Sequence, residues 1–523
     1  MRCRRKSSKR RWTGWSDSSA RHPPAPARQL RHQSARGETS QVDDELLLDC
    51  VDDPERRCQV PASTLTAAFL ERIERYQPVI NAFINVTGER ALRQAGAVDR
   101  ARGHGHPLPL DGMCVAVKDN IDLGGEPTTA GAGFLKANVA RGDAEVVRRL
   151  DQAGAVIVGK TNMHEVAFGG TTDNQFYGTC RNPWDLERIP GGSSGGSGAA
   201  VAADLCIAAL GTDTGGSVRL PAAINGVAGL RPSFGRVSKR GVYPLSWSID
   251  TVGPLARSVR DLAAILVVMG GYDPNDPWAI DYPGALAPTA EPGVEGLRIG
   301  LPDAHFFESL PEEAEGLVRG AAQILADLGA RVGDIHIEGA AAAYEAGVLI
   351  VGVDAVAVNQ EALARQVVSE GTRRRLGLYE GRSGVDYARA TEQAVTWRRL
   401  VQRLLVEQVD ILLTPTTGPP ARIDKSDTIT TTQAMSACTY PWSLAHLTAL
   451  SLPCGFDADG LPVGFQLAAA PGRESVLLRA GLAYQAITAW HTRRPAAVWQ
   501  GAPHPVKRPG FDPAAASAPN QLC

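Results

Sequence analysis

The sequence predicts an α/β protein with a large mixed sheet, helices on both faces of that sheet, and one large domain. Two observations support this fold class. The 523 residues are 44% hydrophobic and 21% charged, as in ordinary globular proteins. Segments with helical spacing of apolar residues alternate with short apolar runs, for example residues 144–154 followed by residues 155–160. That alternation is typical of a buried sheet covered by helices.

The first predicted helix follows a capping signal at Ser63 and ends at Pro78. Its core-facing residues recur at helical spacing and are Leu65, Phe69, Ile73 and Tyr76.

The remaining elements follow in chain order. Residues 270–295 are rich in Pro, Gly and Asp, which predicts a surface loop, and long helices are expected between the strand at 297–301 and residue 408. Further helices are predicted at residues 88–101, 144–154 and 474–491. Strands are predicted at residues 113–117, 155–160, 297–301, 410–415 and 461–468.

The two ends of the chain differ from this pattern. Residues 1–40 contain eleven Lys or Arg but two acidic residues, and they show no hydrophobic period. We therefore expect a disordered basic extension over residues 1–42, an ordered domain over residues 43–499 and a loose tail over residues 500–523.

Composition also narrows the function classes. The net charge of -2 lacks the basic excess of many nucleic-acid-binding proteins, and no run of about 20 apolar residues predicts a membrane span. The nine cysteines are scattered without a CxxC pair, which favours reduced thiols in the cytoplasm. No His, Cys or Asp cluster has metal-ligand spacing, so no metal is expected.

Residues 190–235 are dense in Gly, Ser and Ala, and several interpretations compete. A phosphate-binding loop would need a closing Lys that is absent, and a flexible linker does not fit the Ala-rich helical segment that follows. Residues 191–195 match the G-x-S-x-G nucleophile elbow, but no strand precedes them. That elbow would also need a late histidine, and the candidates are His446, His491 and His504.

A serine–lysine pair is the alternative, because burial can keep a lysine neutral. The chain has eight lysines, of which Lys118 and Lys160 directly follow apolar strands. The ends of buried strands are where α/β enzymes place chemistry. No lysine follows a serine by three residues, so any such pair must form across the fold.

The glycine-serine region resembles the signature of the amidase signature family of serine hydrolases. The match joins G-G-S-S-G-G-S-G-A at residues 191–199 to G-T-D-T-G-G-S-V-R-L-P at residues 211–221. The similarity covers about residues 45–495 and implies the amidase signature fold. Further matching segments lie at residues 115–121, 160–165, 181–185 and 460–466.

The resemblance implies a Ser–cis-Ser–Lys triad. Ser217 would be the nucleophile, Ser193 the bridging serine after a cis peptide bond, and Lys118 the base. The chemistry is consistent, because a serine hydroxyl becomes a good nucleophile only when a base takes its proton.

The turn before Ser217 is predicted to stabilise the oxyanion. Consecutive backbone amides of Thr214, Gly215, Gly216 and Ser217 would converge on the negative charge. An ion pair between the flanking Asp213 and Arg219 is predicted to support this turn. The resemblance further implies that Gly169 and Gly170 belong to the acyl-binding wall.

Other polar residues receive supporting roles. Lys160 is expected near the site or at the surface, and His164 as a polar contact near the substrate entrance. Ser194 and Ser197 are expected to bond the loop or cap the following helix. The run Arg373–Arg375 could offer a guanidinium to a substrate carboxylate, but a solvated basic face is favoured.

The resulting hypothesis is an amidase that hydrolyses a small carboxamide to the acid and ammonia through a seryl acyl-enzyme, without cofactor or metal. The alternative is the glutaminase subunit of a tRNA-dependent amidotransferase, although His164 stands where that subunit tends to have Asp. A non-catalytic binding module is the third hypothesis. The expected partner is a small-molecule amide, with no membrane, no nucleic acid unless the alternative holds, and a homodimer left open.

Overall fold

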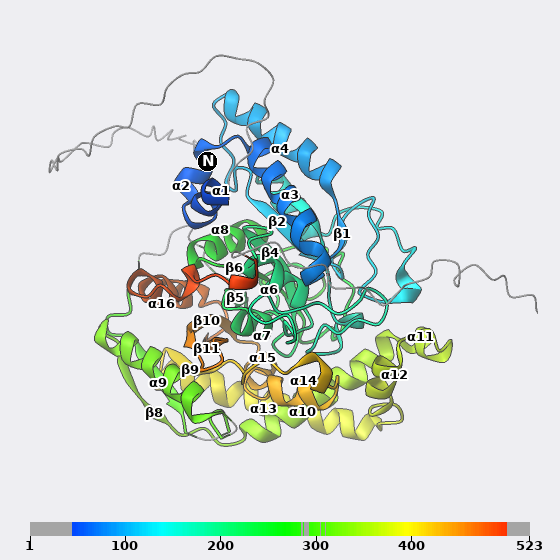
Figure 1. Ribbon diagram of the computed structural model, residues 1–523. Helices are drawn as coiled ribbons and strands as arrows, with labels where there is room; N and C mark the ends of the chain where they lie inside the picture. The colour runs from blue at the N-terminus through cyan, green and yellow to red at the C-terminus, as the bar shows by residue number, and fades with distance from the viewer. Residues whose placement is uncertain (1–43, 284–285, 287–291, 304, 309, 499–523) are drawn as a thin grey trace, which may run out of the picture. The chain divides into compact units, whose positions relative to one another are not determined.

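The computed structural model describes residues 44–498, except residues 284–285, 287–291, 304 and 309. The predicted extension at 1–42 and tail at 500–523 lie outside these residues. Eleven strands form one mixed sheet, and sixteen α-helices accompany it in the described part of the chain (Figure 1). The predicted α/β class with a single large sheet-containing domain is confirmed.

The strands pair in the order β1-β3-β2-β4-β6-β5-β10-β11-β9-β7-β8, so the N-terminal strand lies at one edge. Their bounds are β1 Phe83–Val86, β2 Cys114–Lys118, β3 Val156–Thr161, β4 Ala208–Asp213, β5 Ala228–Arg231, β6 Thr251–Ala256, β7 Arg298–Pro302, β8 Arg331–Ile335, β9 Ile411–Pro415, β10 Thr448–Phe456 and β11 Pro462–Ala469.

Helices pack on the sheet in groups. Helices α3 and α4 pack together and contact β3. In Figure 1 they lie in the upper part of the picture (blue), whereas α10 and α13 pack together in its lower part. The helices are α1 Asp44–Asp52, α2 Pro54–Gln59, α3 Ala62–Ile80, α4 Gly88–Gly103, α5 Glu145–Gln152, α6 Gly195–Ala202, α7 Arg219–Ile224, α8 Val259–Met269, α9 Glu312–Asp327, α10 Ala340–Val358, α11 Gln360–Ala364, α12 Glu370–Gly377, α13 Gly384–Glu407, α14 Thr430–Ser436, α15 Tyr440–Leu444 and α16 Glu474–Ile487.

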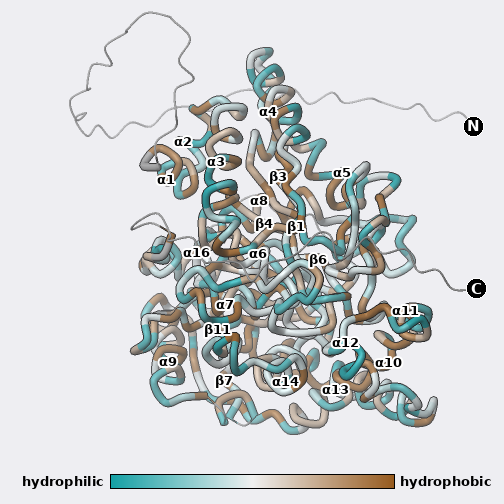
Figure 2. Tube along the Cα trace, turned by 45° about the vertical axis from the view of Figure 1, so that its right-hand side comes forward, coloured by the Kyte–Doolittle hydropathy of each residue, from teal (hydrophilic) through white to brown (hydrophobic). Residues whose placement is uncertain are grey.

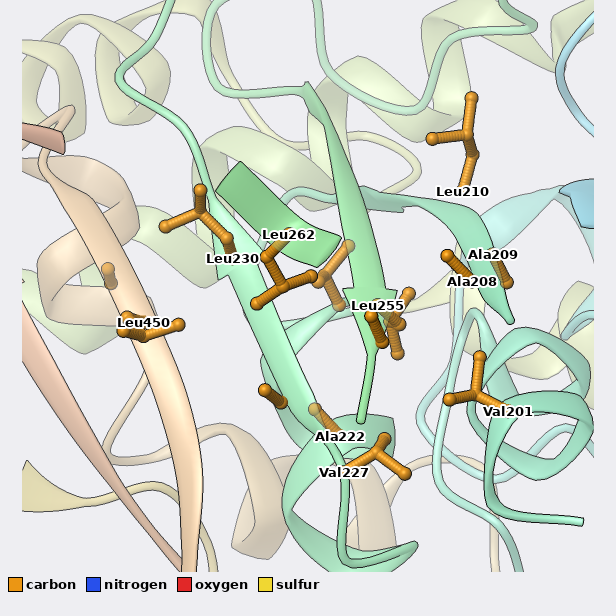
Figure 3. Packing of buried hydrophobic residues seen from close by; sticks show 14 of the residues in the cluster. Val201, Ala208, Ala209, Leu210, Ala222, Val227, Leu230, Leu255, Leu262 and Leu450 are labelled. Atoms are coloured by element: carbon orange, nitrogen blue, oxygen red, sulfur yellow. The ribbon is translucent and has the colours of Figure 1, made fainter. Parts of the chain in front are cut away.

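Apolar side chains fill the space between the central strands and their helices (Figure 3). Leu210 on β4, Leu230 on β5 and Leu255 on β6 are completely buried, and Leu262 of α8 lies between Leu230 and Leu255 in Figure 3. Strands that are buried on both faces read as continuous apolar runs, which is why β2 and β3 were predictable from sequence. This core fixes the strands whose ends carry the site.

Strands β2 and β4 are parallel neighbours, with Val115 opposite Ala208 and Val117 opposite Leu210. Parallel strands end at the same edge of a sheet. The register therefore brings Lys118, the last residue of β2, beside the end of β4, although about 90 residues separate them in sequence.

The first predicted helix is longer than expected and begins differently. Pro61 occupies the N-cap of α3, and the carboxylate of Asp99 accepts the N–H groups of Ala62 and Ser63. The predicted end at Pro78 is wrong, because the helix continues to Ile80 and closes at Asn81 with a φ of 56°. Proline lacks a backbone N–H, so Pro78 removes one helical hydrogen bond, and the last turn of the helix tolerates this loss. The predicted core residues of this helix are buried.

Several strands were missed, and the last helix is shorter than predicted. Strands β4, β5 and β6 lie in or near the glycine-rich region, where small residues hide the strand pattern, and β1, β8 and β10 were also absent from the prediction. Helix α16 ends at Ile487 rather than at residue 491.

One helix in the described residues, α10, is long and apolar enough to cross a membrane by length and composition. The sequence analysis did not single it out, and its apolar character can be followed in Figure 2. Its Asp354 accepts hydrogen bonds from Ser246 and Tyr387, and the helix packs against α13 and α15. Such contacts are typical of a core helix.

Candidate active site

Lys118 is the first element of the site, and its side chain is completely buried at the end of β2. Its Nζ atom donates hydrogen bonds to Ser193 Oγ at 2.8 Å and to Thr212 Oγ1 at 2.7 Å. Burial lowers the pKa of Lys118 to about 7, although the carboxylates of Asp250 and Asp213 act in the opposite direction. A large share of Lys118 is therefore neutral near pH 7.

Ser193 directly precedes Ser194, the N-cap of α6, and the Gly192–Ser193 peptide bond is cis, as predicted. Its hydroxyl accepts the Lys118 hydrogen bond, and its carbonyl accepts the N–H of His164. The adjacent Ser194 and Ser197 donate to the Thr212 and Leu210 carbonyls of β4 instead. Their hydroxyls therefore fasten α6 to the sheet.

The turn after β4 is built around the Asp213 carboxylate. Asp213 forms the predicted ion pair with Arg219 at 3.0 Å and a second pair with Arg231 at 3.1 Å, all completely buried. The two guanidinium groups hold the pKa of Asp213 well below its usual range despite burial. The same carboxylate accepts the N–H groups of Gly216 and Val218, which fixes the turn.

The hydrogen bond from the Gly216 N–H to Asp213 removes one of the four amides predicted to bind the oxyanion, because this amide already has an acceptor. In contrast, the backbone N–H groups of Thr214, Gly215 and Ser217 have no acceptor within the described part of the chain. The Thr214 hydroxyl donates to Asp250 at 2.6 Å, so the residue is anchored through its side chain. Three unoccupied amide donors in one turn suit a developing negative charge.

Ser217 is half-buried and lines a narrow cavity together with Thr214 and Gly215. Its hydroxyl has no hydrogen-bond partner among the residues that the structure describes, so it is free to approach a substrate. The opposite wall includes Gly169, Gly170 and Gly192. The residues predicted for nucleophile, oxyanion turn and acyl wall thus share one cavity.

Close packing explains why glycines form these walls. A Cβ atom on Gly215 would lie 2.1 Å from the Tyr440 ring, and one on Gly169 would lie 2.1 Å from the His164 ring. The N–H of Gly170 donates to Thr432 Oγ1 at 2.8 Å. No larger residue fits at Gly169 or Gly215 without displacing an aromatic ring.

Lys160 is also completely buried, one strand away from Lys118, but it has a charged partner. Its Nζ atom lies 3.0 Å from Asp119 Oδ1 and donates to the Pro127 carbonyl and the Thr128 hydroxyl. Asp119 directly follows Lys118, so this ion pair holds the end of β2. Lys160 is therefore near the site rather than at the surface, and it contacts Asp119 rather than either serine of the site.

His164 lines a second, wider cavity of about 410 Å³, with Glu165, Thr171, Asp173 and Thr428 among its neighbours. Its ring nitrogens contact the hydroxyls of Thr171 at 3.2 Å and Thr428 at 3.0 Å. Burial, with the nearby Arg375 and Lys118, lowers the pKa of His164 to about 3. The imidazole is therefore neutral and suits a polar contact near the entrance.

Of the late histidines, His504 lies outside the described residues, and neither His446 nor His491 lines the cavity of Ser217. His446 follows α15 with a φ of 62°, stacks on Phe234 and contacts the Ser248 carbonyl and Arg398. Burial and Arg398 lower its pKa to about 2. These contacts place His446 in a structural role, apart from the cavity that Ser217 lines.

The sequence favoured a solvated basic face for the run Arg373–Arg375, and this is correct for two of the three residues. The side chains of Arg373 and Arg374 are more than half exposed, but Arg375 is 7% exposed and lines the Ser217 cavity. The prediction of a solvated face is therefore wrong for Arg375. On α12, Arg375 lies on the buried face with Thr372 and Leu376, which the three identical letters could not reveal.

Sequence reasoning missed several other residues. Asn120 and Thr212 both lie inside the matched motif segments, and Asn120 Nδ2 donates to Thr212 Oγ1 at 3.2 Å. Their position beside Lys118 could have been inferred from those segments. Arg231 and Tyr440 carry no local signal, because only the tertiary fold brings them to the turn. Within the described residues, no group of three or more His, Cys, Asp or Glu could hold a metal.

Comparisons with known proteins agree with this geometry. A family model described as amidase matches residues 64–478. A relative from Chloroflexus aurantiacus, named as one of the subunits of glutamyl-tRNA(Gln) amidotransferase, is 42% identical over 467 residues, covering 83% of this chain and 95% of the relative.

Solved structures give the same result. The peptide amidase PAM, in complex with the competitive inhibitor chymostatin, is 33% identical with a TM-score of 0.75, covering 86% of this chain and 98% of that one. The 6-aminohexanoate cyclic dimer hydrolase is 30% identical with a TM-score of 0.78, covering 87% and 99%. On the evidence of its fold and of these matches, the chain belongs to the amidase signature family, whose solved members include amide-hydrolysing enzymes.

Proposed function

We propose that this amidase hydrolyses a carboxamide to the carboxylic acid and ammonia through an acyl-enzyme on Ser217. The observation that carries the proposal is the hydrogen bond from a completely buried Lys118 to Ser193, which directly follows Gly192 in the lining of the Ser217 cavity. A neutral amine there can act as a base, since its pKa is lowered to about 7.

Acylation begins when the Ser217 side chain rotates to donate a hydrogen bond to Ser193, a bond that it does not make among the described residues. Ser217 then passes its proton to Ser193, while Ser193 passes its own proton to the Lys118 amine. Ser217 Oγ forms a bond to the amide carbon, and the carbonyl oxygen becomes an oxyanion. The free N–H groups of Thr214, Gly215 and Ser217 are oriented to receive this charge. The C–N bond then breaks, and the proton returns from Lys118 through Ser193 to the departing ammonia.

Deacylation repeats these steps with water in place of Ser217. Water gives a proton to Ser193 and attacks the acyl carbon, and the Ser217 oxygen leaves with a proton. The overall reaction consumes one amide and one water and produces one acid and one ammonia. Thr212 and Asn120 orient Lys118. The Thr212 Oγ1 atom accepts one hydrogen bond from Lys118 Nζ and another from Asn120 Nδ2.

The test is ammonia release by the purified chain alone from a panel of carboxamides, combined with a fluorophosphonate probe and peptide mapping. We expect ammonia release and one labelled serine, Ser217. Labelling at Ser193, or release without labelling at Ser217, would overturn the assignment of the nucleophile. Failure of the probe to label any serine, with no release from any amide, would favour a non-catalytic module.

A second function is favoured by the relatives named as an amidotransferase subunit, at 42% identity over most of the chain. Here the chain would release ammonia from glutamine inside a complex that acts on charged tRNA. The same assay separates the two functions. Ammonia release from glutamine only in the presence of companion subunits and charged tRNA would replace the stand-alone amidase by this second function.

A further inference from the structure

Arg375 is a buried cation in the cavity that Ser217 lines, and it lacks a carboxylate partner. Its Nη1 atom donates to the Thr428 carbonyl at 2.7 Å, and its guanidinium carbon lies 4.4 Å above the Phe168 ring. No Asp or Glu of the described residues lies within ion-pair distance of it. The other two buried arginines near the turn, Arg219 and Arg231, both pair with Asp213.

The lining of the cavity sharpens this contrast. Arg375 is the charged residue among the described residues that line this cavity, and none of those residues is acidic. The polar groups that accompany Arg375 are hydroxyls, from Ser217, Thr214, Thr432, Ser436 and Tyr440. A buried charge without an opposite charge is costly, and an anion bound here would provide that charge.

The helix that carries Arg375, α12, is held in place at its first turn. Ser369 caps α12 through its hydroxyl, which accepts the Thr372 N–H. The buried carboxylate of Glu165 accepts hydrogen bonds from the Ser369 N–H, the Ser369 hydroxyl and the Thr372 hydroxyl. These contacts tie the first turn of α12 to the segment that follows β3. The guanidinium is thus preorganised, which lowers the entropy lost when it binds a ligand.

We infer that the acyl part of the substrate carries a carboxylate that binds the Arg375 guanidinium, and that it carries no ammonium group. The substrate class is then a short monoamide of a dicarboxylic acid, with its amide at Ser217 and its carboxylate at Arg375. A guanidinium recognises a carboxylate with two parallel hydrogen bonds. This inference rests on the proposed function of Ser217 as the nucleophile.

The absence of an acid from the described lining excludes a different substrate type. An α-amino acid amide such as glutamine has its ammonium on the carbon next to its carboxylate. Bound at Arg375, that ammonium would enter a narrow cavity that offers a like charge and hydroxyls but no carboxylate. Like charges at close range in a buried site repel strongly. The cavity therefore favours a dicarboxylic monoamide over glutamine.

The test compares the value of kcat/KM for malonamate, succinamate and glutaramate with that for butyramide and for glutamine. We expect at least one of the three monoamides to exceed both butyramide and glutamine by about 10²-fold or more, because a buried polar group rejects a ligand that leaves it unpaired. Arg375→Met should remove most of this preference while hydrolysis of butyramide continues. Arg373→Met, on the same helix but exposed, is the matched control and should keep the preference for the dicarboxylic monoamide.

A binding measurement covers the case in which Arg375→Met does not fold. Succinate or glutarate should protect Ser217 of the wild-type protein against a fluorophosphonate, and succinamide or butyrate should protect it far less. Labelled Ser217 with butyramide hydrolysis, but without any preference for or protection by carboxylates, would overturn this inference and leave the proposed function intact. Loss of labelling and of hydrolysis for every amide would instead overturn the proposed function.

Discussion

The Nζ atom of Lys118 lies 2.8 Å from the Oγ atom of Ser193, although 75 residues separate the two in the chain. The parallel pairing of β2 with β4 and the packing of α6 on both strands produce this contact. Because the lysine is completely buried there, its amine differs chemically from a surface lysine.

The first prediction concerns pH. Lys118 must be neutral to accept a proton, and burial lowers its pKa from 10.5 to about 7. Below this pKa the amine is protonated, so kcat/KM should fall tenfold per pH unit on the acid side and reach a plateau above about pH 8. Initial rates between about pH 5.5 and pH 9 test this, with circular dichroism to verify folding. An acid limb with a midpoint near 10 would contradict it.

The second prediction concerns removal of the amine. Lys118→Ala should lower kcat by about 10²–10⁴-fold, because general base catalysis typically contributes this much. Lys136→Ala is the matched control, since Lys136 is exposed and should leave kcat unchanged. A Lys118→Ala variant that retains folded structure and near wild-type kcat would show that Ser217 has another base.

The third prediction concerns the wall of the oxyanion turn. A Cβ atom on Gly215 would lie 2.1 Å from the Tyr440 ring, so Gly215→Ala must displace either the ring or the turn. We expect kcat to fall by about 10²-fold or more, comparable to the loss of an oxyanion donor.

The control for this change is Gly316→Ala on α9, where an added Cβ meets nothing within 4 Å. Alanine is a better helix former than glycine, so Gly316→Ala should keep full activity and raise the free energy of unfolding by about 0.5–1 kcal/mol. Equal activity of the two variants would show that the turn tolerates displacement.

The fourth prediction concerns stability. Asp213→Asn leaves Arg219 and Arg231 buried without their carboxylate, so the free energy of unfolding should fall by about 3–5 kcal/mol. Because the folded state lowers the pKa of Asp213, its contribution is present above the unfolded value of 3.8 and is lost as the pH falls below it. Urea denaturation at pH 7 measures the effect of the substitution, and a second series at about pH 2.5, below the unfolded value, measures the loss on protonation.

The control for the fourth prediction is Glu407→Gln, which removes the exposed pair with Arg403. Exposed pairs contribute about 0–1 kcal/mol, so this variant should unfold almost as the wild type does. A loss for Asp213→Asn no greater than that of Glu407→Gln would mean that the buried network does not stabilise the fold.

The sequence predicted the parts of this site that lie in local motifs. Lys118, Ser193 and Ser217 lie in short restricted segments, and Asp213 with Arg219 lies six residues apart on one turn. Strand β4 escaped prediction because its sequence, AALGTD, has few of the β-branched residues that mark a strand. Arg375 escaped because its burial depends on how α12 docks against residues far away in the chain. Such long-range contacts leave no periodic trace in the sequence.

The most direct measurement is the pKa of Lys118 itself, by NMR titration of protein labelled at the lysine side chains. The chain has eight lysines, so Lys118→Ala identifies the signal. It also separates that signal from Lys239, whose pKa burial lowers to about 8. We predict a midpoint near 7 for Lys118 and the same midpoint for labelling of Ser217 by a fluorophosphonate. A Lys118 pKa near 10.5 would contradict the account, because the amine would then be protonated when the enzyme needs a base.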